Sequence, residues 1–264
     1  MIRVLITGAN GQLGTSIHHQ ATAFPDLQIT YTDKTELNIT NRESLSDYFS
    51  KQEFDYCINC AAYTRVEDAE RNPDIAFAVN AEGVKYLAQN CKTNGIVLFH
   101  ISTDYVFDGK KKEGYLPSDL PNPLNIYGES KLKGEQYIQE ILKEYLIIRT
   151  SWLYSEYGDN FYNTILRKAR EGKNLRVTDA QIGCPTNANN LAMHILQLIN
   201  NSAWKPGIIH FTDKIPMSWF DFAVSITKSH KLDKDIKVVR DRNYRSFAQR
   251  PEYSILLEEK SGNE

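Results

Sequence analysis

Short, mostly apolar runs alternate with longer amphipathic segments through the first 150 residues, and this alternation constrains the fold more than any other feature. The apolar runs are IRVLIT, LQITYTD, FDYCINCAA, GIVLFHIS and YLIIRTSW. Helical patterns lie between them and begin near Gln12, Asn41, Ile75 and Asn125. Strands that read as continuous apolar runs are typical of a parallel sheet with helices on both faces. With right-handed crossovers, the pattern predicts an α/β fold with a doubly wound parallel sheet of the Rossmann type.

A glycine-rich segment, GANGQLG, follows the first expected strand and opens the first expected helix. It places Gly8, Gly11 and Gly14 in a G-x-x-G-x-x-G spacing rather than G-x-G-x-x-G. Glycines there permit a tight turn and the close approach of a pyrophosphate to the helix N-terminus. A plain strand-to-helix turn is the alternative, but the position inside a β-α-β unit favours a dinucleotide.

Asp33 stands at the end of the second expected strand. A carboxylate at this point can accept hydrogen bonds from an adenosine ribose, which favours NADH. The adjacent Lys34 can instead meet a 2′-phosphate, so the residues leave NADPH or NADH open. A turn carboxylate is the structural alternative for Asp33, because Asp is common after strands.

Two later strand ends supply further candidate residues. Ala62, Tyr63 and Thr64 follow the third expected strand, and Thr103 and Asp104 end the fourth. Ligands in doubly wound sheets bind beyond the carboxyl ends of the strands. We therefore expect these residues to face the cofactor.

Tyr127 and Lys131 lie four residues apart in the segment YGESK, within an expected helix. Residues i and i+4 share one helix face, so the Lys131 charge is expected to bring the phenol pKa closer to neutral. Tyr127 is then a candidate general acid, and Thr103 offers a hydroxyl to the same substrate oxygen. A Y-x-x-x-K pair alone is often only a helix surface. Combined with the glycine segment and Thr103, it predicts hydride transfer from a nicotinamide.

The sequence changes character after residue 151, where Gly, Asp, Asn and Tyr become frequent. A helix is expected near 160–170, and a later helix at 188–200 followed by GIIHFT suggests a return to the sheet. We therefore expect a dinucleotide-binding domain of residues 1–151 plus about 187–214. A smaller, discontinuous substrate-binding region would comprise about 152–186 plus 215–264.

Charge and composition exclude several classes of function. A net charge of -2 over 264 residues gives no general attraction to nucleic acid or to an anionic membrane. No apolar stretch is long enough to span a bilayer, and the chain begins directly with a strand-like run, so we expect a cytoplasmic protein. Cys57 and Cys60 are expected to be buried, reduced thiols. The histidines show no metal-ligand spacing, and we expect no bound metal.

These motifs, in this order, resemble the extended short-chain dehydrogenase/reductases. The segments AAYTRVEDAE, ISTDYVFDG, YGESKLKGE, IIRTSWLY and RPEYS narrow the resemblance. Together with GANGQLG they are similar to the dTDP-4-dehydrorhamnose reductases over nearly the whole chain. The resemblance implies NADPH- or NADH-dependent reduction of the C4 keto group of dTDP-4-dehydro-L-rhamnose to dTDP-L-rhamnose. It also implies a sugar-nucleotide substrate, a role in carbohydrate biosynthesis and, as one option, a homodimer.

The same resemblance assigns roles to individual residues. Tyr127 would donate the proton, Lys131 would bind the nicotinamide ribose and tune Tyr127, and Thr103 would polarise the C4 carbonyl. Asp104 and Trp152 match sugar-nucleotide contacts, although Trp152 can equally be a core anchor. The positions expected to contact the cofactor are Gly8, Gly11, Gln12, Leu13, Gly14, Asp33, Asn38, Ile39, Ala62, Tyr63, Thr64, Tyr127 and Lys131.

Two departures from the family pattern bear on these expectations. Only ten residues follow RPEYS, where the family usually continues with a further helix, so the substrate region or self-association is expected to differ. Asn38 stands where the family often carries an acidic residue, which would alter that cofactor contact.

Two other functions stay open from the sequence. A sugar-nucleotide dehydratase or epimerase shares the fold and the Tyr-Lys pair, but dehydratases carry an Asp-Glu pair where Asp104 is followed by Tyr105. A non-catalytic, reductase-like regulatory subunit is the second alternative. The presence of Thr103, Tyr127 and Lys131 argues against it.

Overall fold

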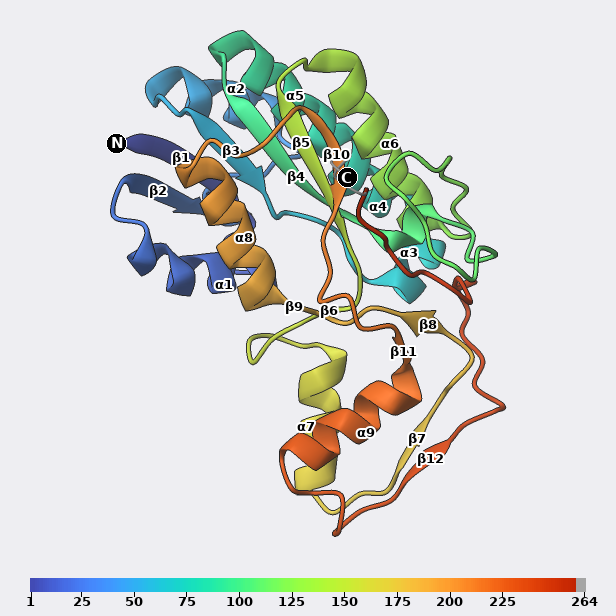
Figure 1. Cartoon of the computed structure of the whole chain (residues 1–264). Helices are drawn as coiled ribbons and strands as arrows, with labels where there is room; N and C mark the ends of the chain where they lie inside the picture. Colours follow the sequence, from blue (N-terminus) through green and yellow to red (C-terminus); the bar gives the residue numbers. More distant parts are fainter. Residues whose placement is uncertain (260–264) are drawn as a thin grey trace, which may run out of the picture.

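The computed structural model describes residues 1–259 and shows a parallel sheet between two layers of helices, with a smaller helical region beside it (Figure 1). All neighbouring strands of the sheet pair in parallel. In spatial order the strands are β2 (Leu27–Thr32), β1 (Ile2–Thr7), β3 (Tyr56–Asn59), β4 (Val97–Thr103), β5 (Tyr145–Thr150) and β10 (Gly207–His210). The doubly wound sheet predicted from the sequence is confirmed.

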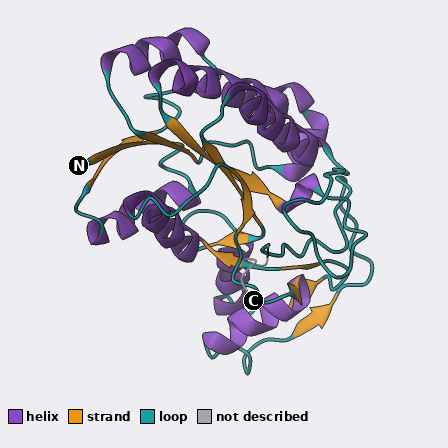
Figure 2. Cartoon of the chain, turned by 45° about the horizontal axis from the view of Figure 1, so that its top comes forward, coloured by secondary structure: helices purple, strands orange, loops and turns teal. Residues whose placement is uncertain are grey.

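Helices cover both faces of this sheet (Figure 2). Val4 and Ile6 of β1 join the apolar core under α1 (Gln12–Gln20) and α8 (Ala188–Asn200). Leu5, which lies between them, joins the core on the opposite face. The helices on that face are α2 (Arg42–Lys51), α5 (Gly83–Asn94) and α6 (Ile126–Ile141). Successive strand residues point to opposite faces, so a strand buried on both faces must be apolar throughout.

Local sequence sets where these helices begin and end. Asn41, Asn125 and Asn160 are N-caps whose side chains accept a backbone N–H three residues ahead, at 2.8–3.0 Å. Asn is among the preferred residues at this position because its side-chain oxygen satisfies a free amide of the first turn. Gly95 ends α5 with a φ of +66°, a left-handed conformation that glycine adopts without strain.

The segment between β3 and α5 is more irregular than the sequence indicated. A single helix was expected from about residue 75 to 90. The structure has α3 (Val66–Arg71), α4 (Pro73–Phe77) and a π-helical turn at Ala78–Glu82 that leads into α5. π-helical turns inside α-helices often mark functional positions.

The smaller region has an apolar cluster of its own, which includes Ile165, Leu166, Phe222 and Ile226. Its main elements are α7 (Phe161–Arg170), β7 (Leu175–Val177), α9 (Trp219–Ser229) and β12 (Val238–Arg240). β12 pairs in parallel with β7. Short strand pairs connect this region to the sheet: β6 (Leu153–Tyr154) with β9 (Thr186–Asn187), and β8 (Ile182–Gly183) with β11 (Met217–Ser218).

The domain boundaries given from the sequence stay a prediction, and residues 260–264 of the expected second region lie outside the described residues.

Near the end of the described chain, Leu256 packs with Val106, Phe107 and Tyr115. Val106 belongs to the 3₁₀ turn η3 (Asp104–Val106), which directly follows β4. A further 3₁₀ turn, η1 (Ala21–Ala23), follows α1. The chain therefore returns to the sheet side after α9 and β12.

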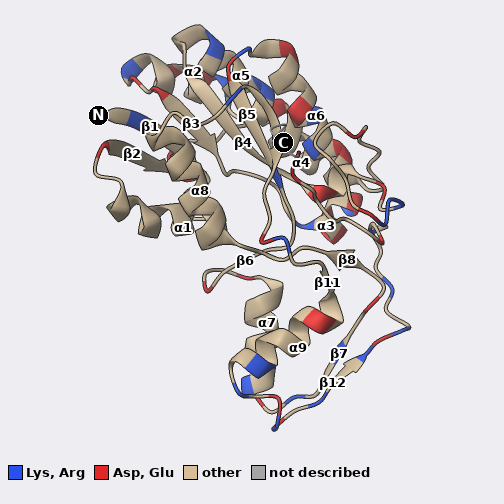
Figure 3. Ribbon diagram, viewed as in Figure 1, with Lys and Arg blue, Asp and Glu red and all other residues tan. Residues whose placement is uncertain are grey.

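Several global features bear on the class of protein. Lys, Arg, Asp and Glu are interspersed over the surface, and α1 and α8 carry none of them (Figure 3). No helix within residues 1–259 has the length and apolarity of a membrane span. Cys57 and Cys60 are free thiols, the first buried and the second partly buried. No cluster of three metal-ligating side chains occurs in this described part of the chain.

A buried ion pair joins α6 to β5. Arg149 donates from Nε to Glu135 Oε1 at 3.0 Å and from an Nη to Oε2 at 2.7 Å, and both side chains are almost fully buried. Ser102 of β4 also donates its hydroxyl to Glu135. A bidentate pair of this kind fixes geometry, because each charged group has its partners in place.

Removing one partner of this pair is expected to destabilise the fold strongly. Glu135→Ala leaves Arg149 buried without its counter-charge, so the free energy of unfolding should fall by about 3–5 kcal/mol. Chemical denaturation monitored by far-UV circular dichroism measures this change. The double variant Glu135→Leu/Arg149→Met is the control and should recover much of the loss. Equal stability of Glu135→Ala and the wild type would contradict the role of the pair.

Candidate active site

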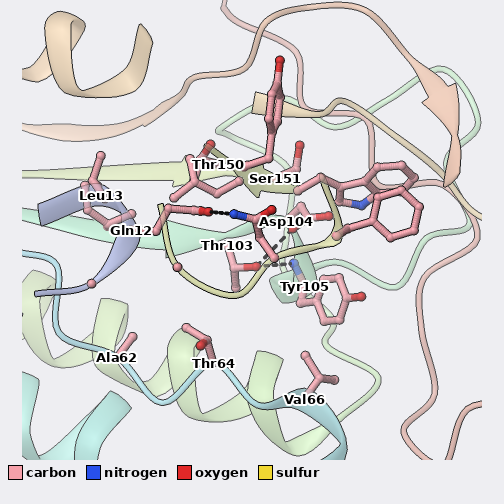
Figure 4. Close-up of a pocket in the computed structure, with 18 of the residues that line it drawn as sticks. Gln12, Leu13, Ala62, Thr64, Val66, Thr103, Asp104, Tyr105, Thr150 and Ser151 are labelled. Carbon is pink, nitrogen blue, oxygen red and sulfur yellow. Dashed lines mark hydrogen bonds between the residues drawn. The ribbon is translucent and has the colours of Figure 1, made fainter. Parts of the chain in front are cut away.

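A cavity of about 640 Å³ opens at the carboxyl ends of the sheet strands, next to the smaller region. It lies beyond β1 and β3, where the order of the strands reverses, which is the position of the ligand crevice in doubly wound sheets. Figure 4 shows side chains from several strand ends and loops facing it. The predicted site residues that line it are Gly11, Gln12, Leu13, Gly14, Ala62, Thr64, Thr103, Asp104, Tyr127, Lys131 and Trp152.

The glycine segment fits the approach of a dinucleotide. Gly8 has a φ of +69°, and a Cβ there would lie 2.6 Å from the backbone nitrogen of Ala61. A Cβ on Gly14 would lie 2.4 Å from the carbonyl oxygen of Ala9. Gly11 is the N-cap of α1 and lines the cavity, so the free amides of the first turn face this space. Such a helix terminus suits the phosphates of NADPH or NADH.

Five predicted cofactor contacts lie outside the cavity lining: Gly8, Asp33, Asn38, Ile39 and Tyr63. Asn38 accepts hydrogen bonds from the amide and hydroxyl of Thr40, and Ile39 is buried in an apolar core. These five assignments stay predictions.

Asp33 has the turn role that the sequence offered as an alternative. Its Oδ1 accepts hydrogen bonds from the amide and hydroxyl of Thr35 and from the amide of Glu36. Hydrogen bonding by Thr35 chiefly lowers the pKa of this carboxyl, which is therefore ionised. Asn10, from the glycine segment, donates to Oδ2 at 2.5 Å. The carboxylate therefore lies beside the glycine loop, the side from which a ribose would approach.

Close packing places Tyr127 and Lys131 at the cavity. A Cβ on Gly128 would lie 2.1 Å from the carbonyl oxygen of Tyr105, and one on Gly134 would lie 2.2 Å from that of Asn80. Only glycine allows α6 to approach this closely. The first turns of the helix therefore rest directly on the segments that follow β3 and β4.

Thr103 lies at the end of β4 and shares the cavity wall with Tyr127. Its Oγ1 donates to Asp104 Oδ1 at 3.1 Å and accepts the amide of Tyr105 at 3.2 Å. The ring of Tyr105 meets the ring of Tyr127 edge to face, with centroids 5.7 Å apart. The phenol and hydroxyl predicted to act together are thus brought to one place.

The electrostatics of the Tyr-Lys pair differ from the expectation. Burial raises the pKa of Tyr127 well above its usual value, and the Thr103 hydroxyl opposes this only in part. Lys131 Nζ donates to the carbonyl oxygen of Ile101 at 2.7 Å and lies 3.2 Å from His100 Nε2. The expectation that Lys131 brings the phenol pKa towards neutral is wrong for this structure, because burial dominates. Tyr127 accordingly holds its proton throughout the neutral range.

Asp104 is buried and has an unusual protonation equilibrium. Burial raises its carboxyl pKa to about 7, and the nearby hydroxyls of Ser254 and Thr103 oppose this rise only in part. Its Oδ2 is buried and has no hydrogen-bond partner among the described residues. A buried polar atom without a partner is costly, so this oxygen is suited to a hydroxyl group of a ligand.

Trp152 forms the wall between the sheet and the smaller region. Its ring stacks on Trp219 with centroids 3.5 Å apart and an angle of 6° between the planes. The ring also packs against Gly183, because a Cβ on that glycine would lie only 2.6 Å from a ring carbon of Trp152. Trp152 has a φ of +48°, which is strained for a bulky residue and is often found at functional sites. It packs as an anchor and also lines the cavity, while its contact with a sugar nucleotide stays a prediction.

Three residues that support the site were missed from the sequence: Asn80, Asn160 and Arg250. Asn80 lies in the π-helical turn, is fully buried, and bonds both backbone groups of Tyr63 and the hydroxyl of Ser130. It thereby joins the loop after β3 to α6. In the sequence, Asn80 stands out as a polar residue between the apolar residues of an expected helix. Only the π-helical turn of the structure shows where its side chain points.

The other two connect the cavity to the smaller region and the C-terminal segment. Asn160 donates to Gln12 Oε1 at 2.6 Å, so the N-cap of α7 contacts the glycine segment. Arg250 donates to Glu67 at 2.8 Å and to the Tyr105 hydroxyl at 3.3 Å. Both contacts join residues far apart in the sequence, so the spacing of residues within a motif does not predict them.

The crowding at Gly14 gives a test of the cofactor site. In Gly14→Ala the new Cβ meets the backbone of Ala9, and overpacking of this kind costs about 1–3 kcal/mol. If that strain is relieved by moving the loop, the affinity for NADPH should fall roughly 10- to 100-fold. Titration of the reduced cofactor by fluorescence measures this. Thr15→Ala, one residue further along α1, is the control and should bind as the wild type does. Undiminished affinity in Gly14→Ala would contradict the placement of the pyrophosphate.

Comparison with known proteins agrees with this geometry. The family model described as "RmlD substrate binding domain" matches residues 2–264. The dTDP-4-dehydrorhamnose reductase of Aggregatibacter actinomycetemcomitans is 37% identical, over 97% of this chain and 90% of its own length. The spore coat polysaccharide biosynthesis protein SpsK of Bacillus subtilis is 38% identical, over 97% and 89%.

Solved structures show the same relationship. The dTDP-4-dehydrorhamnose reductase of Bacillus anthracis, in complex with NADP, superposes with a TM-score of 0.92 at 39% identity, over 98% of this chain and 91% of its own. A dTDP-4-dehydrorhamnose reductase of Clostridium acetobutylicum gives a TM-score of 0.92 at 37% identity, over 97% of this chain and 90% of its own. A UDP-glucose 4-epimerase of Thermus thermophilus, at 18% identity and a TM-score of 0.80, shares the fold alone. The chain belongs to the RmlD substrate binding domain family.

Proposed function

We propose that this protein catalyses the NADPH-dependent reduction of the C4 keto group of dTDP-4-dehydro-L-rhamnose to dTDP-L-rhamnose. The observation that carries the proposal is the convergence of Thr103, Tyr127 and Lys131 with the glycine segment in one cavity. Relatives named dTDP-4-dehydrorhamnose reductase, at 37% and 35% identity over 97% of this chain, support the substrate. The NADP complex of the Bacillus anthracis relative supports the phosphorylated cofactor.

Each side chain has a defined task in this reaction. A bound nicotinamide cofactor supplies the hydride that adds to the C4 carbon. Tyr127 holds a proton at its phenol oxygen and delivers it to the C4 oxygen as negative charge develops there. Thr103 orients that oxygen through its hydroxyl, and Lys131 binds the nicotinamide ribose.

A second cavity suits the nucleotide part of the substrate. It has a volume of about 430 Å³ and shares Phe161, Trp219 and Arg250 with the first. Its other basic residues, Lys168, Lys173 and Arg176, come from α7, β7 and the connection between them. Figure 3 shows basic residues along β7 and β12 at this edge. Cationic side chains suit a diphosphate and aromatic rings suit a base, so the sugar would extend from here towards Tyr127.

A reductase acting on a different 4-keto sugar nucleotide is the second candidate. A dTDP-4-keto-6-deoxy-D-glucose reductase of Streptomyces niveus is 33% identical over 96% of this chain. The dehydratase alternative is less well supported, because Tyr105 stands in the place of its glutamate and is buried against Tyr127. A homodimer and a cytoplasmic location remain part of the proposal and rest on the family resemblance.

The proton-donor role predicts a specific kinetic defect. Tyr127→Phe removes only the hydroxyl, so turnover should fall roughly 10²- to 10⁴-fold while NADPH affinity stays near that of the wild type. The loss of NADPH absorbance with enzymatically prepared dTDP-4-dehydro-L-rhamnose measures turnover. Glu129→Ala, on the exposed side of the same helix, is the matched control and should retain full activity. Full turnover in Tyr127→Phe would rule out the role.

The position of Asp33 predicts an effect on cofactor choice. Asp33→Ala removes a carboxylate that would accept bonds from the ribose of NADH and repel the 2′-phosphate of NADPH. The ratio of kcat/KM for NADPH to that for NADH should therefore rise, as measured by steady-state kinetics with each cofactor. An unchanged ratio would mean that Asp33 serves only the turn built with Thr35.

A further inference from the structure

A chain of hydrogen bonds crosses the interior of the sheet and ends at Lys131. Thr7 of β1 donates to Asn59 Oδ1 at 2.7 Å, and Asn59 Nδ2 lies 2.9 Å from His100 Nδ1. His100 Nε2 lies 3.2 Å from Lys131 Nζ. None of the four side chains has more than 1% of its surface exposed. Each comes from a different element, so the chain links β1, β3, β4 and α6.

The orientation of the Asn59 amide is fixed by the backbone. The amide of Ala61 donates to Asn59 Oδ1 at 3.2 Å. A backbone N–H can only donate, so the side-chain oxygen must be on this side. The Thr7 hydroxyl, which donates or accepts, is compatible with this arrangement. Asn59 Nδ2 therefore faces His100 as a donor.

This orientation fixes the tautomer of His100. Because Asn59 donates to Nδ1, that nitrogen carries no proton, and the proton of the neutral imidazole is on Nε2. Burial chiefly lowers the pKa of His100 well below its usual value, so the ring is neutral. Its Nε2–H points at Lys131 Nζ.

We infer that His100 points its Nε2–H at Lys131 Nζ and thereby favours the neutral amine form of this lysine over the ammonium in the ligand-free protein. An ammonium has three donors and no acceptor, whereas a neutral amine has a lone pair. Another N–H of Lys131 donates to the carbonyl oxygen of Ile101 at 2.7 Å. His100 is in this account a positioning residue that acts through Lys131.

The other groups around Lys131 do not remove this constraint. Burial lowers the lysine pKa to about 8, while Glu135 and Cys60 oppose the shift. The Glu135 carboxylate pairs with Arg149 at 2.7 Å and accepts a hydrogen bond from the Ser102 hydroxyl. The Arg149 charge therefore offsets most of the attraction between Glu135 and Lys131. Burial raises the pKa of the Cys60 thiol to about 12, so this group is uncharged. Tyr127, which also lines the cavity, is a neutral phenol.

On the basis of the proposed function, cofactor binding is expected to change the protonation of Lys131. Lys131 would hold the ribose of a bound cofactor, whose oxygens and phosphate charge favour an ammonium. Nζ would then take up a proton from solvent and lose the bond from His100. The protein is therefore expected to take up a proton when NADPH binds near the titration midpoint of Lys131.

Two NMR readouts on the full-length, ligand-free protein test the inference without any substrate. Imidazole ¹⁵N shifts report the His100 tautomer, assigned by comparison with His100→Gln. Lysine ¹³Cε shifts report the titration of Lys131, assigned by comparison with Lys131→Arg. We expect the Nε2–H tautomer and a Lys131 midpoint at or below about 8, against about 10.4 for the exposed lysines. An Nδ1–H tautomer, or an ordinary lysine midpoint, would overturn the inference.

Two variants separate the tautomer from simple electrostatics. In Asn59→Asp the carboxylate accepts from both Ala61 and His100 Nδ1–H, so the ring proton should move to Nδ1 and the Lys131 midpoint should rise by more than about one pH unit. His100→Gln adds no charge but can offer an oxygen to the ammonium, so its Lys131 midpoint should rise too. A rise in Asn59→Asp without a change of tautomer would overturn the role of His100. Because no turnover is measured, either result is independent of the proposed reductase activity.

Discussion

Close packing of helix α6 against the sheet decides where the reactive side chains lie. Gly128 and Gly134 let the helix rest on backbone carbonyls, and the buried carboxylate of Glu135 ties it to the neighbouring strand. Tyr127 and Lys131 are carried to the carboxyl ends of β4 and β5 as a result. Any side chain at the two glycines would push the helix away, and the phenol of Tyr127 would leave its place in the cavity wall.

Burial of polar side chains at this site sets their protonation states. The phenol of Tyr127 holds its proton at neutral pH, and burial raises its pKa further; burial also raises the carboxyl pKa of Asp104 to about 7. His100 of β4 and Asn59 of β3 connect the lysine of the pair to Thr7 of β1. Buried polar groups are costly unless they are paired, so an unpartnered oxygen such as Asp104 Oδ2 indicates where a ligand completes the site.

The sequence predicted those features that depend on local pattern. Continuous apolar strands require a sheet covered on both faces, and the glycine spacing with an i, i+4 Tyr-Lys pair located two parts of the cavity wall. It did not predict the π-helical turn at Asn80 or the positive φ of Trp152, because both depend on contacts between distant segments. It was wrong about the pKa of Tyr127, since proximity on a helix face says nothing about burial or about the other partners of Lys131.

The central claim is that hydride passes from NADPH to C4 of a sugar nucleotide while this protein supplies the proton. The most direct measurement uses NADPH that carries deuterium at the transferable position of the nicotinamide, with NMR analysis of the isolated sugar nucleotide. We predict one deuterium at C4 of dTDP-L-rhamnose for each NADPH oxidised. Product without deuterium at C4, or conversion of the substrate without oxidation of the cofactor, would contradict the account.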